Sequence, residues 1–249
     1  MASTLLPTPE KKPAPPAPTG SDLITTIEAG RRGGNDVGFK RSLMLAWTLA
    51  LTDWKLRFYG SVLGVFWTLA RPFAFFGVVY VVFTEIIGLD ASVKNYGVYI
   101  LLSMVLFQYF SEIATSSVTS LVSRENLLRK MYFPPLVIPM AVGLTAALNL
   151  GMTLVAVLVF VLANGIFPQF AWLQLPLIIA LLTVFALGIG MLLSSLYVRY
   201  RDVQPIWEVT SQLVFYASPI LYVATMVPEE YQRIYLCNPI AALLTQARK

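Results

Sequence analysis

The amino-acid sequence predicts an all-α integral membrane protein with an N-terminal amphipathic helix and about five transmembrane helices. Hydrophobic residues make up 57% of the 249-residue chain and charged residues only 12%, which leaves too little polar surface to cover a soluble fold. Five apolar stretches reach the roughly 20 residues that a helix needs to cross about 30 Å of hydrocarbon. The net charge of +5 comes from basic residues beside these stretches, which suits anionic lipid headgroups better than a nucleic acid.

The first 40 residues differ in composition from the rest of the chain. Prolines recur between Pro7 and Pro18, and polar, glycine-containing sequence follows as far as Gly38. Such a segment cannot bury enough apolar surface to offset the entropy lost on ordering. We therefore expect residues 1–40 to form a disordered tail. Because no apolar signal-peptide core follows the start, the tail is predicted to stay in the cytoplasm.

Residues 41–59 have the pattern of a helix that lies along a membrane surface. At 100° per residue, one face is polar and carries Arg41, Thr48, Thr52 and Lys55. The opposite face is apolar and carries Leu43, Ala46, Trp47, Ala50 and Trp54. Indole rings favour the headgroup boundary, and basic side chains at the end of the helix can reach lipid phosphates. The simpler interpretation is an ordinary juxtamembrane anchor.

The predicted spans are residues 62–89, 96–122, 136–163, 173–198 and 206–227. Lys and Arg are more frequent before the first span, between the second and third, and between the fourth and fifth than in the other loops. Since cytoplasmic loops carry the excess of basic residues, the N-terminus is predicted to be cytoplasmic. Five spans then place Lys249 outside.

Polar residues inside three spans indicate faces that avoid lipid. One face of the second span carries Gln108, Glu112, Thr115, Ser116, Thr119 and Ser123. The first span has a face with Trp67, Arg71, Phe75 and Glu85, and the fifth has one with Glu208, Ser211, Gln212, Phe215, Pro219 and Tyr222. On the fifth span above all, groups that can bind hydroxyls are mixed with aromatic rings, which favours a passage for a sugar chain. Hydrogen bonding between helices is the alternative. On the first span, Arg71 and Glu85 are too far apart to pair along one helix, so each is expected to have a partner elsewhere.

The third and fourth spans carry small residues at four-residue spacing, which indicates close helix packing. These residues are Gly143, Ala147 and Gly151 in the third span and Ala186, Gly190 and Ser194 in the fourth. The chain has no His, and its one cysteine is Cys237, so His/Cys metal sites, an intrachain disulfide and His-based acid–base catalysis are excluded.

The sequence has no glycine-rich phosphate-binding loop that ends in Gly-Lys-Ser/Thr, so ATP cannot bind in that manner. A short charged segment at 123–135 ends in two prolines, as a docking helix for a soluble partner would. A solvated turn between spans is the alternative interpretation.

Several ordered motifs from Asp53 to the end of the chain carry a resemblance. The first set is Lys55-x-Arg57-Phe58, Ser61, Leu63-Gly64, Trp67 and Pro72. The second is Asn126, Leu128, Lys130, Phe133-Pro134 and Pro139, and the third is Arg201-Asp202, Ser218-Pro219, Tyr222 and Asn238-Pro239. Their order resembles the permease (transmembrane) subunits of ABC exporters for polysaccharides, which move lipid-linked O-antigen, teichoic acid and related cell-wall glycans.

The resemblance implies a homodimeric channel in the bacterial cytoplasmic (inner) membrane, with two separate ATPase (nucleotide-binding) subunits. ATP and Mg would bind to those subunits, so this chain would be a transport subunit without cofactor, metal or nucleic acid. It also implies an outer re-entrant segment at 228–247. Family members continue into a sixth span, whereas this sequence stops at Lys249; we therefore expect the gene to encode about 20 further apolar residues.

The resemblance also implies roles for particular residues. The lipid-diphosphate end of the substrate would enter at Lys55 and Arg57, whose charge suits a diphosphate. The channel would be lined by Trp67, Arg71, Phe75, Glu112, Ser211, Gln212, Phe215 and Tyr222. Coupling to the ATPase would involve Glu125, Asn126, Arg129, Lys130, Arg201 and Asp202.

Two other functions remain open. A drug or small-molecule exporter of the same superfamily shares a looser version of these motifs. A membrane glycosyl or phosphoglycosyl transferase would also handle a lipid-linked sugar, but it needs carboxylates gathered at the membrane surface. Near that surface the only neighbouring acids are Asp202 and Glu208, apart from Glu125.

Overall fold

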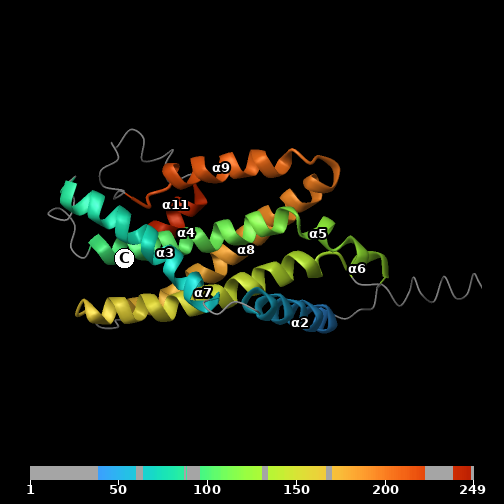
Figure 1. Cartoon of the computed structure of the whole chain (residues 1–249), viewed down its shortest axis with the longest axis horizontal. Helices are drawn as coiled ribbons and strands as arrows, with labels where there is room; N and C mark the ends of the chain where they lie inside the picture. The colour runs from blue at the N-terminus through green and yellow to red at the C-terminus, as the bar shows by residue number, and fades with distance from the viewer. Residues whose placement is uncertain are drawn as a thin grey trace, which may run out of the picture. The chain divides into compact units, whose positions relative to one another are not determined.

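The computed structural model describes residues 39–59, 64–86, 88, 96–130, 134–166, 170–221 and 238–247, all of which belong to the compact unit Phe39–Lys249. Within these residues every regular element is a helix, as the sequence predicts (Figure 1). The predicted tail at 1–40 lies outside the described residues except for its last two positions, which begin the first described helix.

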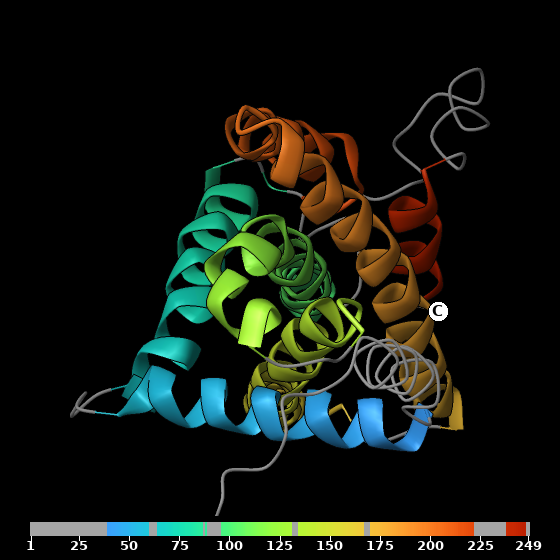
Figure 2. The same ribbon diagram turned by 90° about the vertical axis from the view of Figure 1, so that its right-hand side faces the viewer.

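Helix α2 (Phe39–Phe58) corresponds to the predicted surface helix and begins two residues earlier than expected. Figure 2 shows α2 extended across the view, whereas α4 (Tyr96–Val118) is seen nearly along its axis. The helix therefore runs crosswise to the central span, as a helix in the plane of a membrane surface would.

Packing changes the interpretation of the apolar face of α2. Its central alanines, Ala46 and Ala50, are fully buried against Val137 and Ala141 of α7 (Val137–Ala163). Small side chains allow this close approach of two helices. Trp47 stays 45% exposed, so only the edge of the apolar face remains available to lipid.

Four described helices are long and apolar enough to cross a membrane. The first comprises α3 (Gly64–Val81) and a π-helical turn (Val82–Ile86), and the others are α4, α7 and α8 (Gln174–Arg199). A 3₁₀ turn (Phe170–Leu173) precedes α8. The bounds of α7 and α8 agree with the predictions to within one residue. The second predicted span, at 96–122, breaks after Val118 and continues as α5 (Ser120–Ser123). Helix α6 (Glu125–Lys130) follows, within the charged segment at 123–135.

The predicted fifth span at 206–227 differs from the structure. Its helix, α9 (Val203–Ala217), has 15 residues, which is shorter than the roughly 20 that a perpendicular span needs. The helix ends because Ser218 is extended (φ −92°, ψ 151°), the conformation favoured before a proline such as Pro219. The rest of that prediction, from 222 onward, lies outside the described residues.

Helix α11 (Pro239–Gln246) is the described part of the predicted outer segment at 228–247. Its N-cap is Asn238, whose side-chain oxygen accepts a hydrogen bond from the Ile240 backbone N–H at 3.0 Å. Proline follows at the first helical position, where its missing N–H costs nothing. The motif Asn238-Pro239 is therefore a helix start, and Asn238 also donates to Ser218 Oγ at 3.2 Å.

Helix α4 forms the centre of the described bundle and contacts α3, α7, α8 and α9 (Figure 2). The predicted small-residue contacts are found at Gly143, where an added Cβ would lie 2.8 Å from Leu187, and at Gly190. Ala186 and Ser194 are buried, whereas Gly151 is exposed, and a Cβ added there would have no atom within 4 Å. Enclosure of α4 explains why its polar face meets protein and not lipid.

Candidate functional site

A cavity of about 820 Å³ lies between the end of α2 and helices α3, α4, α7 and α9. Helix α3 contributes one continuous face, which consists of Gly64, Trp67, Thr68, Arg71, Pro72 and Phe75. Helix α4 contributes part of its polar face, including Gln108, Ser111, Glu112, Thr115 and Ser116. These residues line the same cavity because they recur every three or four positions, and such positions share one face of a helix.

The charged side of the cavity is centred on Glu112. Its Oε1 accepts a hydrogen bond from Arg57 Nη1 at 2.7 Å and another from Asn149 Nδ2 at 2.7 Å. Three elements, α2, α4 and α7, therefore meet at one carboxylate oxygen. The Glu112 side chain is 24% exposed and the Arg57 side chain 45%, so the guanidinium also faces open space.

Aromatic rings also line the cavity. The Phe215 ring of α9 lies 6.2 Å from Phe75 of α3 and 5.2 Å from Phe107 of α4, measured between ring centroids. Trp67 adds a fourth ring to the wall. Flat apolar rings next to charged and amide groups can hold a ligand that is itself part anion and part sugar.

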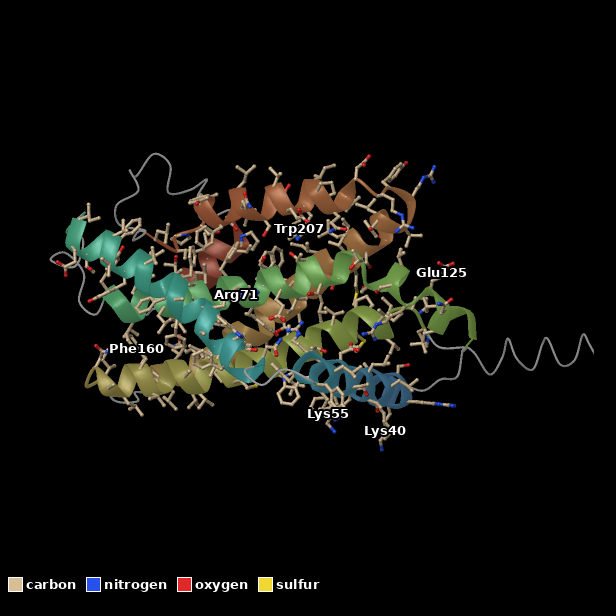
Figure 3. All side chains as sticks on the ribbon, viewed as in Figure 1. Lys40, Lys55, Arg71, Glu125, Phe160 and Trp207 are labelled. Atoms are coloured by element: carbon tan, nitrogen blue, oxygen red, sulfur yellow. The ribbon has the colours of Figure 1, made fainter. Side chains whose placement is uncertain are left out.

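Polar side chains fix α9 beside α4. Ser211 and Ser111 are joined by a hydrogen bond of 3.1 Å between their hydroxyls. Trp207 Nε1 donates to Thr115 Oγ1 at 3.0 Å, and Figure 3 shows Trp207 between the two helices. Hydrogen bonding between helices, the alternative considered for this polar face, is thus present at Ser211.

The cavity gathers most of the residues predicted to line a channel. Its wall contains Trp67, Arg71, Phe75, Glu112 and Phe215. Ser211 contacts the wall residue Ser111, Gln212 is exposed and is not part of the wall, and Tyr222 lies outside the described residues. The role of these residues in transport stays a prediction.

Arg57 and Lys55, predicted to act together, lie in different surroundings. Arg57 lines the cavity, whereas Lys55 points away from the bundle (Figure 3). The cavity contains another cation, Arg71, which forms no ion pair or hydrogen bond with any residue that the structure describes.

A second ion pair joins α2 to Arg124, which lies between α5 and α6. Asp53 pairs with Arg124, one turn of α2 before Arg57. Both pairs border a smaller cavity of about 230 Å³. Sequence reasoning missed Asp53, Arg124 and Asn149 as site residues. Two features of the sequence could have indicated them. Asp53 is the one acidic residue in α2, and Asn149 is an amide inside an apolar span.

Comparison with known proteins identifies the family. Residues 44–249 match the family model for the ABC-2 type transporter. The chain belongs to the ABC-2 type transporter family. It is a multi-pass membrane permease subunit, and in such systems the ATPase is a separate subunit that binds the nucleotide.

Relatives of this ABC-2 permease include named export proteins. The O-antigen export system permease protein RfbA of Klebsiella pneumoniae is 29% identical over 79% of this chain and 75% of its own length. RfbA of Myxococcus xanthus is 27% identical over 82% of this chain and 78% of its own. The polysialic acid transport protein KpsM of Escherichia coli is 22% identical over 85% of this chain and 83% of its own.

The residues predicted to couple the permease to an ATPase lie on two connections at the same end of the bundle (Figure 1). Glu125 and Asn126 are exposed on α6; Arg129 and Lys130 belong to the same helix, but their side chains are outside the described set. Arg201 and Asp202 are exposed between α8 and α9, where the Arg201 guanidinium lies 5.0 Å from the Tyr197 ring centroid.

In the part of the chain that the structure describes, no three His, Cys, Asp or Glu residues are grouped as metal ligands.

Proposed function

We propose that this chain is the transmembrane subunit of an exporter that moves a lipid-linked polysaccharide across the bacterial cytoplasmic membrane. O-antigen, teichoic acid or another cell-wall glycan would be the cargo. The names of the relatives, O-antigen export permease and polysialic acid transport protein, support this class of substrate. The ATPase partner would supply the energy of ATP hydrolysis.

The observation that carries the proposal is the composition of the 820 Å³ cavity. Its basic residues, Arg57 and Arg71, suit a lipid diphosphate, because guanidinium groups bind phosphate through charge-assisted hydrogen bonds. Its aromatic residues suit pyranose rings, whose apolar faces stack on aromatic side chains. One cavity thus offers both kinds of group that a lipid-linked glycan requires.

The proposal includes an arrangement of subunits and a membrane orientation. Two copies and two ATPase subunits would form the exporter, with the N-terminus, α2 and α6 on the cytoplasmic side. Support comes from the excess of basic residues in the loops on that side and from the crosswise position of α2. Lys55 would contact lipid headgroups at the surface, and Arg57 would receive the diphosphate.

Two phenylalanines of α3 provide a matched test. Phe75 and Phe66 are 52% and 59% exposed, but only Phe75 lines the cavity. In proteoliposomes that contain the complex, Phe75→Ala should lower ATP-driven export of a lipid-linked glycan roughly 2-fold to 10-fold, since an aromatic contact contributes about 0.5–1.5 kcal/mol. Phe66→Ala should export at the normal rate.

The same assay decides between the proposal and a drug exporter. Wild-type complex should transport the lipid-linked glycan and leave a set of amphipathic drugs in place. Transport of drugs without transport of glycan would refute the proposed substrate class. Equal loss in both phenylalanine variants would refute the role of the cavity.

A further inference from the structure

The large cavity has an excess of positive charge that its internal contacts do not neutralise. Two guanidinium groups line it, Arg57 and Arg71, but the only carboxylate among the described wall residues is Glu112. Glu112 pairs with Arg57, which leaves Arg71 without a counter-ion among the described residues. A cation inside a membrane span is costly unless it meets an opposite charge. Arg71 is exposed in the cavity, where a bound anion would supply this charge.

We propose that Arg57 and Arg71 bind a phosphate or diphosphate group together, and that Glu112 is an internal counter-ion which holds Arg57 until this anion replaces it. The proposal rests on the proposed function and specifies how its binding site is regulated. Without a ligand, Arg57 then forms its ion pair with Glu112. With a ligand bound, Arg57 forms its ion pair with the phosphate group.

The contacts of Glu112 allow this exchange. Its Oε1 accepts one hydrogen bond from Arg57 and one from Asn149, both at 2.7 Å. When Arg57 leaves, the bond from Asn149 remains, so the carboxylate keeps a partner. Asn149 is only 4% exposed, so packing holds the amide in place for this role. A buried carboxylate left without any partner would oppose the exchange.

Helix α2 has other attachments that keep it in place while Arg57 changes partner. One turn earlier, Asp53 pairs with Arg124, and two turns earlier Ala50 packs against α7. Arg57 lies in the last turn of the helix, and its side chain is 45% exposed. The guanidinium contacts Glu112 through Nη1 and carries further N–H donors, so it can turn toward an anion in the cavity.

The test measures anion binding to the full chain purified with its ATPase partner in lipid nanodiscs. The probes are farnesyl diphosphate and inorganic pyrophosphate. Arg57→Gln and Arg71→Gln should each weaken binding of farnesyl diphosphate by about tenfold or more, as expected for loss of a charge-assisted hydrogen bond. Glu112→Gln should tighten binding several-fold, because a neutral amide competes less for Arg57 while it still accepts from Asn149. Lys40→Gln, which removes an outward-pointing charge from the same helix, should change nothing (Figure 3).

Different results would overturn different parts of the inference. Unchanged or weaker binding of farnesyl diphosphate by Glu112→Gln would refute the counter-ion role of Glu112. This variant tests that role even if Arg57→Gln fails to assemble. Unchanged binding in Arg71→Gln would refute the two-arginine site, and an equal loss in Lys40→Gln would reduce the effect to surface charge. Pyrophosphate that binds as tightly as farnesyl diphosphate would refute a lipid-linked ligand. A complex that binds the anion as expected but exports no glycan would refute the proposed function alone.

Discussion

Gly190 determines how closely α8 approaches α4 at the centre of the bundle. A Cβ added at Gly190 would lie 2.7 Å from the Oγ and 2.8 Å from the Cβ of Ser117, a buried residue of α4. Two residues earlier on the same helix, Gly188 is exposed, and an added Cβ there would have no atom within 4 Å. The two glycines thus differ in packing although they share a helix.

Alanine substitutions at the two glycines should have opposite effects. Gly190→Ala should destabilise the protein by about 1–3 kcal/mol, because the methyl group forces a packed core to shift. Gly188→Ala should leave stability unchanged or raise it by up to about 1 kcal/mol through helix propensity. The thermal unfolding midpoint of each variant in detergent measures its change in stability. Equal midpoints would contradict the close contact between α8 and α4.

At the scale of elements, α2 is attached to the bundle by two ion pairs that lie one helical turn apart. Asp53 binds Arg124 between α5 and α6, and Arg57 binds Glu112 on α4. The first pair connects the surface helix to the segment predicted to contact the ATPase. The second connects it to the cavity. Helix α2 therefore joins the cavity to that segment.

Asp53→Asn and Arg124→Gln should each loosen α2, at a cost of about 0.5–1.5 kcal/mol for a partly buried pair. If the two residues act on each other, the double variant should be no less stable than the worse single variant. The measurement is the thermal unfolding of the wild type, the two single variants and the double variant, which together form a double-mutant cycle. Additive losses would show that Asp53 and Arg124 contribute independently, which would contradict the pairing.

Most spans could be predicted from sequence because long apolar runs determine where a helix enters and leaves the membrane. Helix α7 was predicted at 136–163 and lies at Val137–Ala163. The fifth span was predicted to run through Ser218, since hydropathy continues past that residue, whereas the backbone becomes extended before Pro219. Backbone geometry at one residue thus ended a helix that composition alone would continue.

Site residues that share one face of a single helix could be predicted from the sequence. Contacts between residues of different helices could not. Four-residue spacing placed Trp67, Arg71 and Phe75 on one face of α3, and all three line the cavity. Spacing also grouped Gln212 with Phe215, but only Phe215 reaches the wall. The pairing of Glu112 with Asn149 joins residues from different spans, so periodicity within one helix carries no information about it.

At the scale of the whole described molecule, the two connections predicted to contact the ATPase lie at the same end of the bundle (Figure 1). One is α6, and the other is the exposed turn between α8 and α9 that contains Arg201 and Asp202. The ABC-2 family places ATP hydrolysis in a separate subunit. A surface made from both connections would let that subunit act on α4 and α9, which both line the cavity.

The last prediction tests this docking surface by charge reversal. The purified chain alone should hydrolyse no ATP, and addition of its ATPase partner should produce substrate-stimulated hydrolysis. Arg129→Glu combined with Lys130→Glu should lower co-purification and stimulated turnover by about tenfold, because the reversed charges would repel acidic groups of a partner that docks on α6. Lys40→Glu combined with Arg41→Glu changes the net charge equally at the start of α2 and should leave both quantities unchanged. Hydrolysis by the chain alone would contradict the need for an ATPase partner. Equal effects of the two double variants would contradict a specific contact at α6.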